Sequence, residues 1–148
     1  VSKSDIRTAN AQALVQVLGK KNQESMPENV RVIAVSSTGA GGSRIKVGMG
    51  IGKMIEHHLR HVLRDHNGQE EALQALPQGV VTIVRPTALG EGAPTMQALL
   101  EFGDLDKSPT IQTDRADLAD WVVQEVATGK HKGQKVNVTG VKISKKKH

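Results

Sequence analysis

An apolar run followed by hydroxyl and glycine residues is the feature that most constrains the fold of this chain. Residues 30–35 (VRVIAV) are almost continuously apolar, which is typical of a strand buried inside a parallel sheet. Residues 36–38 all carry hydroxyl groups, and six glycines follow within residues 39–52. A helix is expected from about Ile51. Because open parallel sheets bind ligands beyond the carboxyl ends of their strands, we expect a ligand site around residues 36–38.

A second apolar run predicts that the first strand has a parallel neighbour. Residues 80–84 (VVTIV) form another buried strand, and apolar residues recur at helical spacing over residues 51–66. A helix that crosses between the two strands predicts a right-handed parallel connection. Asn67 and Gly68 predict the end of this helix, and a second short helix is expected over residues 69–76.

The remaining segments complete the expected α/β pattern. The further elements that we predict are a helix over residues 5–18 ended by Gly19, a helix over 95–102, a brief strand over 110–113, a helix that ends near residue 128, and a last strand over 134–139. Asp114 and Asp117 are spaced as a carboxylate capping box at the start of the helix that ends near residue 128. The length of 148 residues suits one core, so we expect one domain over residues 1–140 and a basic tail over residues 141–148.

Composition excludes several classes of protein. The net charge of +5 comes largely from lysines near the end of the chain, where no aromatic residue offers a stacking surface, so nucleic-acid binding is not expected. The absence of cysteine excludes disulfides and thiolate metal sites, and it agrees with a cytoplasmic location. No apolar run has the length of a membrane span, and no segment resembles a signal peptide, so no membrane partner is expected.

The glycine segment lacks both standard phosphate-binding fingerprints. A P-loop needs four residues between its glycines, but Gly48 and Gly52 enclose three, and Lys53 is followed by methionine. The dinucleotide pattern G-x-G-x-x-G fails from Gly39 and from Gly50, because Arg44 and Ile55 occupy the position of the third glycine. We therefore interpret the segment as a mobile active-site or surface loop.

The histidines of the central helix favour a solvated surface over a metal site. His57 and His61 have the i, i+4 spacing of zinc ligands. However, Arg60 and Arg64 share that face, opposite the apolar stripe, and would repel a cation. We predict no metal site.

Lys53 and the serines at the end of the first strand are the candidate binding residues. Lys53 is placed at the start of a helix, where the backbone N–H groups and the helix dipole also attract anions. Ser36 and Ser37 are expected at the same edge of the sheet. A phosphate or a ribose hydroxyl would suit this group, and the alternative is that Lys53 is simply a solvated lysine.

Three segments together resemble the atypical short-chain dehydrogenase/reductase family, of the NmrA-like group. They are VRVIAVSST (residues 30–38), VVTIVRPTAL (80–89) and TDRADLADWVV (113–123). The resemblance implies a Rossmann-like parallel sheet with flanking helices and NAD(P) as the cofactor. The family's opening half with its glycine fingerprint has no counterpart here, so the chain resembles the second half of the fold.

The same resemblance implies roles for individual residues. Ser37 and Lys53 match the catalytic Ser and Lys of tyrosine-dependent members, but Met49 stands at the position of the tyrosine, and the chain contains no tyrosine. The general acid of that mechanism is therefore missing, which favours binding over catalysis. The residues expected to contact the cofactor are Ser36, Ser37, Lys53, Pro86, Thr87 and Leu89.

We therefore expect an NAD(P)-linked protein of this family that acts on or senses a small organic molecule. A cofactor-independent isomerase and a non-catalytic binding or regulatory module stay open as alternatives. Dinucleotide binding by this chain alone should be weak or absent, because no fingerprint loop is available for the pyrophosphate. A half-sheet leaves an open edge, so self-association or pairing with another chain is also expected.

Overall fold

The computed structural model describes residues 4–21 and 30–141. Its elements in chain order are α1 (Ile6–Lys21), β1 (Val32–Val35), a short 3-10 helix (Gly48–Gly50), α2 (Ile51–His58), α3 (Arg60–Leu73), β2 (Val81–Pro86), β3 (Ala88–Gly90), β4 (Leu100–Phe102), β5 (Gln112–Asp114), α4 (Arg115–Thr128) and β6 (Lys135–Thr139). The predicted basic tail beyond Val141 lies outside the described residues.

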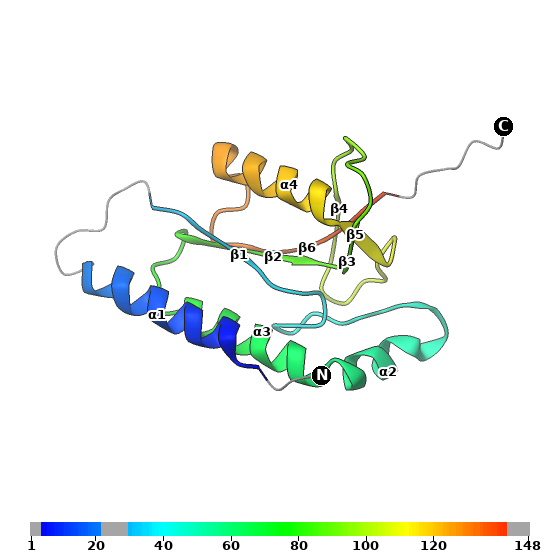
Figure 1. Cartoon of the computed structure of the whole chain (residues 1–148), viewed down its shortest axis with the longest axis horizontal. Coiled ribbons are helices and arrows are strands. Elements are labelled where there is room, and N and C mark those ends of the chain that lie inside the picture. The colour runs from blue at the N-terminus through cyan, green and yellow to red at the C-terminus, as the bar shows by residue number, and fades with distance from the viewer. Residues whose placement is uncertain (1–3, 22–29, 142–148) are drawn as a thin grey trace.

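The architecture is a mostly parallel sheet between two layers of helices. Four strands lie in the order β1-β2-β6-β4, and only β4 runs antiparallel to its neighbour. Strands β3 and β5 form a separate parallel pair. Helix α4 covers one face of the sheet, and α1, α2 and α3 lie on the other side (Figure 1). The predicted α/β class with a parallel sheet and flanking helices is confirmed.

The two apolar runs are adjacent parallel strands, as predicted. Their register runs from Val32 opposite Val81 to Val35 opposite Val84. Because side chains alternate along a strand, each run supplies apolar residues to both faces. One core cluster, on the side of α1 and α3, contains Ala11, Ala34, Leu73, Leu76 and Ile83. The other, on the side of α4, contains Val84, Leu99, Leu118, Val136 and Val138.

Asp65 fastens α1 to α3. Its carboxylate accepts hydrogen bonds from the backbone N–H groups of Arg7 and Thr8, at 3.2 and 2.9 Å, and from the Thr8 hydroxyl at 2.9 Å. The carboxylate of one helix therefore caps the amino end of another, where the helix dipole also favours a negative charge. Burial opposes ionisation of Asp65, but these hydrogen bonds outweigh it, so its pKa lies below the ordinary value.

The predicted helix stop at Asn67 and Gly68 is wrong. Helix α3 continues through both residues to Leu73. A Cβ atom at Gly68 would lie 2.3 Å from Thr8 Oγ1, so this glycine permits the close approach of α1 and does not end the helix. The predicted helix over residues 51–66 is instead divided at Leu59, which separates α2 from α3. Gly19 does not end α1 either, since α1 extends to Lys21.

Two further expectations for the second half of the chain are wrong. No helix forms over residues 95–102; strand β4 lies there and pairs with β6, and Leu99 enters the core beside it. Asp114 and Asp117 do not form a capping box. The Asp114 carboxylate accepts a hydrogen bond from Gly92 N, and Asp117 accepts two from Thr95, so both hold the preceding loop over the start of α4. The predicted strand over 110–113 is displaced slightly, to β5.

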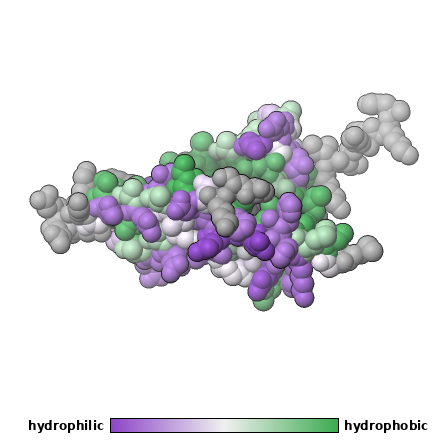
Figure 2. Space-filling view, turned by 60° about the horizontal axis from the view of Figure 1, so that its bottom comes forward, coloured by the Kyte–Doolittle hydropathy of each residue, from purple (hydrophilic) through white to green (hydrophobic). Residues whose placement is uncertain are grey.

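The surface formed by the helices below the sheet is divided by polarity. Figure 2 shows hydrophilic residues in the middle of this side and apolar residues along its upper border and at one end. Within the described residues, no helix is long and apolar enough to cross a membrane. Nor do the described residues include a group of three or more His, Cys, Asp or Glu side chains that could hold a metal ion.

Candidate functional site

A cavity of about 560 Å³ lies where β1 and β2 end. Its lining residues come from the ends of both strands, the segment before α2, helix α2 and the loop before β5. They are Ser37, Thr38, Ile45, Lys46, Val47, Gly48, Ile51, Ile55, Leu59, Pro86, Thr87, Ala88, Ser108, Thr110 and Ile111. The position matches the rule that parallel sheets bind ligands beyond the carboxyl ends of their strands.

The walls of this cavity are mainly aliphatic, with hydroxyl groups on the side of the sheet. Ile45, Ile51, Ile55 and Leu59 contribute the apolar wall, and Ser37, Thr38 and Thr87 contribute hydroxyls. Among the residues that the structure describes, no Asp or Glu lines the cavity. Such a site suits a largely apolar ring with a few hydrogen-bonding groups.

Three of the predicted site residues line the cavity, and three do not. Ser37, Pro86 and Thr87 are in its wall. Ser36 is buried on the other side of the backbone, where its hydroxyl donates to Glu70 Oε1 at 2.7 Å. Leu89 lies in β3 and is 41% exposed.

Lys53 is exposed on α2 and does not line the cavity. The reason is helical geometry: Ile51 and Ile55, one turn apart, face the cavity, and the residue midway between them points to the opposite side. The roles predicted for Ser37 and Lys53 in catalysis and for all six residues in cofactor binding stay predictions. The side chain of Met49, at the family's tyrosine position, is outside the described part of the structure.

Several lining residues were not predicted from the sequence. Ile51, Ile55 and Leu59 were recognised as the apolar stripe of a helix, but a stripe does not show whether it faces a core or a cavity. Residues 108–111 lead into the brief strand predicted over 110–113, but nothing in the sequence indicated that they border a cavity. Residues 45–48 lie within the glycine segment that was interpreted as an active-site or surface loop, but no pattern singled them out as lining residues.

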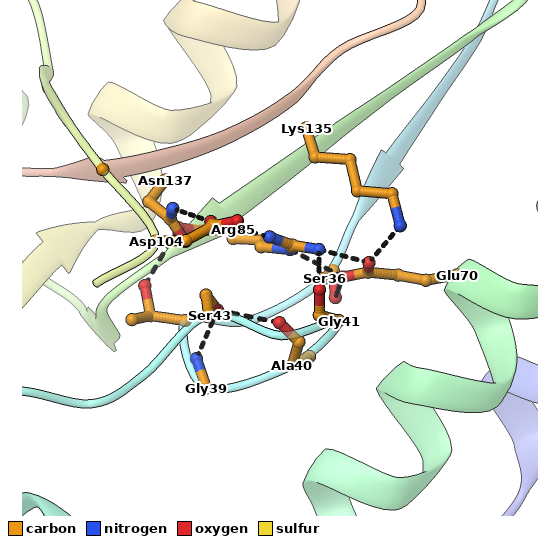
Figure 3. A network of polar contacts seen from close by, with 12 residues as sticks. Ser36, Gly39, Ala40, Gly41, Ser43, Glu70, Arg85, Asp104, Lys135 and Asn137 are labelled. Carbon is orange, nitrogen blue, oxygen red and sulfur yellow. Dashed lines mark hydrogen bonds and ion pairs between the residues drawn. The ribbon is translucent and has the colours of Figure 1, made fainter. Parts of the chain in front are cut away.

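A buried arginine joins the parts of the chain that surround the cavity (Figure 3). Arg85 is fully buried at the end of β2. Its Nη2 lies 2.6 Å from Glu70 Oε2 of α3 and 3.0 Å from the carbonyl oxygen of Gly41. Its Nη1 lies 3.0 Å from Asp104 Oδ1, in the loop after β4. One guanidinium therefore fixes a helix and two loops relative to the strand.

Glu70 is the principal partner of this arginine. Its carboxylate accepts hydrogen bonds from Arg85, from the Ser36 hydroxyl and from Lys135 Nζ at 3.2 Å. Burial opposes its ionisation, but the bonds from Arg85 and Ser36 outweigh burial and lower the pKa of Glu70. Burial also opposes the charge of Arg85, and Glu70 outweighs it, which raises the pKa of Arg85. Both groups therefore stay charged inside the protein.

The glycine loop is shaped by the same network. Gly41 has a φ of +58°, and a Cβ atom there would lie 2.0 Å from Arg85 Nη2 and 2.1 Å from Glu70 Oε2. Only glycine fits this position. Gly41 N donates to Asn67 Oδ1 at 2.6 Å, and Ser43 Oγ accepts from Gly39 N at 2.9 Å. These bonds hold the first part of the loop that we interpreted as mobile.

A cluster of four threonines supports the opposite wall. Thr87 Oγ1 lies 2.9 Å from both Thr113 Oγ1 and Thr139 Oγ1, and Thr139 contacts Thr110 Oγ1. Thr113 and Thr139 are fully buried, whereas Thr87 and Thr110 line the cavity. The hydroxyls tie the end of β2 to β5, to β6 and to the loop at residue 110.

A second cavity of about 510 Å³ adjoins the first. The two share the wall residues Val47, Gly48, Ser108, Thr110 and Ile111. Asp114 and Asp117 line the second cavity, but both carboxylates already hold the loop before β4. The site therefore has two compartments, of which only the first lies against the ends of β1 and β2.

A family model described as NAD(P)H-binding matches residues 7–128. The chain belongs to this NAD(P)H-binding family. The match includes β1, α2 and β2 and the loop before β5, and so the segments that line the first cavity. The resemblance to atypical short-chain dehydrogenases/reductases is confirmed. None of the curated proteins compared with the chain matches it.

Solved structures share the fold at low sequence identity. A short-chain dehydrogenase/reductase from Veillonella parvula in complex with NADP is 17% identical, with a TM-score of 0.68, and the match covers 90% of this chain and 58% of that one. A protein from Bacillus halodurans assigned as an NAD-dependent epimerase/dehydratase is 21% identical, with a TM-score of 0.67, over 90% of this chain and 54% of that one.

A third match is a protein from Streptococcus pneumoniae assigned as an NADH-flavin reductase. It is 14% identical, with a TM-score of 0.59, over 88% of this chain and 65% of that one. The chain therefore spans little more than half of the length of the first two structures and less than two thirds of the third. At sequence identities this low, the matches show that this chain shares the fold of these structures.

The residues of the first cavity fit one end of a nicotinamide dinucleotide. Aliphatic walls and the hydroxyls of Ser37, Thr38 and Thr87 suit a flat ring that carries a carboxamide. For the pyrophosphate, the described residues offer no glycine fingerprint at a helix start. The lining of the first cavity therefore fits the nicotinamide end of the cofactor and not its pyrophosphate.

Proposed function

We propose that this chain forms the nicotinamide side of an NAD(P)-linked, short-chain dehydrogenase/reductase-like protein that acts on or senses a small organic molecule. The observation that carries the proposal is the first cavity, which lies at the carboxyl ends of β1 and β2 in a chain of the NAD(P)H-binding family. The NmrA-like subgroup and a cytoplasmic location stay predictions.

In this proposal, the chain's own residues bind and orient the ring. Pro86 and Ala88 supply an apolar surface at the end of β2, and Ile55 supplies the facing one. The hydroxyls of Ser37 and Thr87 are placed to accept hydrogen bonds from a carboxamide. When bound, the reduced cofactor would supply a hydride. The aliphatic wall would exclude water from the face of the ring.

The lack of tyrosine supports a second candidate, a protein that binds without turnover. No phenol is available to donate a proton to a reduced carbonyl. One measurement distinguishes a ligand sensor from an enzyme that uses a general acid other than tyrosine. NADPH that is oxidised in the presence of a quinone, followed at 340 nm, indicates an enzyme. Saturable binding with no oxidation indicates a sensor.

Calorimetry with two halves of the cofactor tests the proposal. Nicotinamide mononucleotide should bind this chain weakly, with a Kd on the order of 1 mM, and ADP-ribose should not bind measurably. Ala88→Phe should abolish the binding, because Ala88 is exposed and lines the cavity, so the larger side chain fills the site without entering the core. Ala119→Phe, on the exposed side of α4, is the matched control. Binding of ADP-ribose alone would overturn the proposal.

We also propose that the free edge of β1 pairs with a strand of a complementary α/β segment. Strand β1 ends the sheet, so one row of its backbone groups has no neighbouring strand among the described residues. Val35, Val123 and Val126 are 38%, 65% and 58% exposed, and the solved structures continue well beyond the part that this chain matches.

Light scattering after size exclusion tests this second proposal. The chain alone should associate or precipitate as its concentration rises, and Val123→Lys with Val126→Lys should reduce the association. Met96→Lys, at a residue that is 91% exposed in the loop before β4, is the control. A monodisperse monomer at high concentration would contradict the proposal, and a stable dimer would indicate a second copy as the partner.

A further inference from the structure

The first cavity contains one charged side chain, and it is not the lysine that the sequence suggested. Among the residues that the structure describes, Lys46 is the only charged residue that lines this cavity. Lys53 points away from it, as described above. Lys107 lines only the second cavity, and Arg44 pairs with Glu56, at 3.6 Å. A negative charge on a ligand in the first cavity would therefore meet Lys46.

Most hydroxyl groups of the wall already donate their protons to the protein. Ser37 Oγ donates to the carbonyl oxygen of Thr38, and Thr38 Oγ1 donates to that of Arg85, each at 3.1 Å. Ser108 Oγ donates to the carbonyl oxygen of Thr110. The Thr87 hydroxyl lies 2.9 Å from the Thr113 and Thr139 hydroxyls, and either atom of each pair can be the donor. The hydroxyls of Ser37, Thr38 and Ser108 keep lone pairs for a ligand, so they accept hydrogen bonds and do not offer them.

Thr110 completes this pattern. Its hydroxyl lies 3.1 Å from the carbonyl oxygen of Gln112 and 2.9 Å from that of Gly140. The ammonium of Lys46 has three protons, and its Nζ donates one of them to the carbonyl oxygen of Leu105. Two protons remain. Lys46 is therefore the charged side chain on this wall that can still donate to an electron-rich oxygen.

The position of Lys46 also suits this role. It belongs to the segment between the glycine loop and α2, and its bond to Leu105 crosses to the loop after β4. Arg44 N donates to Asp104 O at 2.9 Å beside it, and Asp104 is held from below by Arg85 and Asn137. Lys46 therefore joins the segment before α2 to the loop after β4, and Asp104 of that loop is fixed by Arg85 and Asn137.

We infer that Lys46 anchors the anionic oxygen of an otherwise apolar small molecule in the first cavity. The ligand class is an apolar or aromatic body that carries one carboxylate, sulfonate or enolate-type oxygen. This inference rests on the proposed function only in taking the first cavity as a ligand site. The aliphatic walls receive the body of the ligand, and the lysine pairs with its single charge, which a largely apolar site otherwise disfavours.

A pair of fluorescent probes that differ by one charge tests the inference. The probe 1-anilinonaphthalene-8-sulfonate has an aromatic body and one sulfonate, and N-phenyl-1-naphthylamine is its neutral counterpart. Lys46→Met should raise the Kd of the sulfonate about five- to tenfold and change the Kd of the neutral probe less than about twofold. Lys46→Arg should keep most of the affinity for the sulfonate.

Three further variants separate the possible outcomes. Lys53→Met should change neither Kd, because Lys53 is outside the cavity. Ile55→Asn should weaken both probes, because Ile55 belongs to the apolar wall. Val126→Asn reports any binding to exposed apolar residues of α4. Circular dichroism and thermal unfolding of each variant show that it is folded.

Equal effects of Lys46→Met and Lys53→Met on the sulfonate would overturn the inference, as would an equal loss of both probes in Lys46→Met. The same measurements distinguish failure of the proposed function from failure of the inference about Lys46. If nicotinamide mononucleotide does not bind but the sulfonate depends on Lys46, the cavity binds an anionic apolar ligand without the cofactor. If the mononucleotide binds and Lys46 has no effect, only the present inference fails.

Discussion

Arg85 Nη2 and Glu70 Oε2 lie 2.6 Å apart, and both side chains are almost completely buried. The pair links the end of β2 to α3, and the same guanidinium holds Gly41 and Asp104. A buried ion pair contributes little net stability by itself, but the loss of one partner leaves an uncompensated charge. Its role here is to fix the loops that surround the cavity.

Glu70→Gln should therefore destabilise the protein strongly. The buried guanidinium of Arg85 would lose its main counter-ion, and Asp104, whose side chain is 51% exposed, compensates only in part. We expect a loss of about 3 kcal/mol in the free energy of unfolding, measured by urea denaturation at pH 7. Glu71→Gln is the matched control, since Glu71 is exposed on the same helix. A loss below about 1 kcal/mol for Glu70→Gln would contradict this role.

Stability should fall in acid, and Asp65 should account for part of the fall. The pKa of Asp65 is lower in the folded protein than in the unfolded chain, so its contribution is present above about pH 4 and is lost as the pH falls through the folded pKa. The lowered pKa of Glu70 acts in the same direction. Burial lowers the pKa of His66, so protonation of His66 also favours the unfolded state below about pH 6.5.

Asp65→Asn tests this pH dependence. The variant should lose about 2 kcal/mol at pH 7, because the amide cannot accept all the bonds that cap α1, and the difference from the parent should shrink towards pH 3. Asp120→Asn, on the exposed side of α4, should show no such convergence. A constant difference between the parent and Asp65→Asn from pH 7 to pH 3 would show that the charge of Asp65 is not involved.

Gly41→Ala should be more destabilising than Gly42→Ala. Both glycines have positive φ, so both substitutions strain the backbone by about 1 kcal/mol. Only at Gly41 would the methyl group also collide with Arg85 and Glu70, whereas nothing lies within 4 Å of the position at Gly42. We expect an additional cost of about 2 kcal/mol or more for Gly41→Ala. Equal thermal unfolding temperatures of the two variants would contradict the packing described for this loop.

The sheet could be predicted from the sequence because its signal is local. Residues 30–35 and 80–84 are continuous apolar runs, and they form adjacent parallel strands. The errors come from contacts distant in sequence. Gly68 was interpreted as a helix stop, but its lack of a side chain serves the approach of Thr8, more than fifty residues earlier. No local pattern contains that information.

The sequence predicted which strand ends meet at the candidate cavity better than it predicted which side chains line that cavity. The end of β1 was correctly placed beside the end of β2, but successive residues that leave a strand point to opposite sides. Two adjacent serines therefore could not show that Ser37, and not Ser36, faces the cavity. Lys53 was predicted as a binding residue because a helix starts near it. Lys46 lies in a loop without periodicity, so no sequence pattern predicted it as a site residue.

The most direct test of the central claim is to map nicotinamide binding on the ¹⁵N-labelled chain by NMR. Titration with reduced nicotinamide mononucleotide should shift the backbone amides of Ser37, Thr38, Thr87 and Ile55, which surround the first cavity. The amides of Val123 and Val126 on α4 should not move. Shifts confined to residues outside the cavity, or no shift at millimolar ligand, would contradict the account.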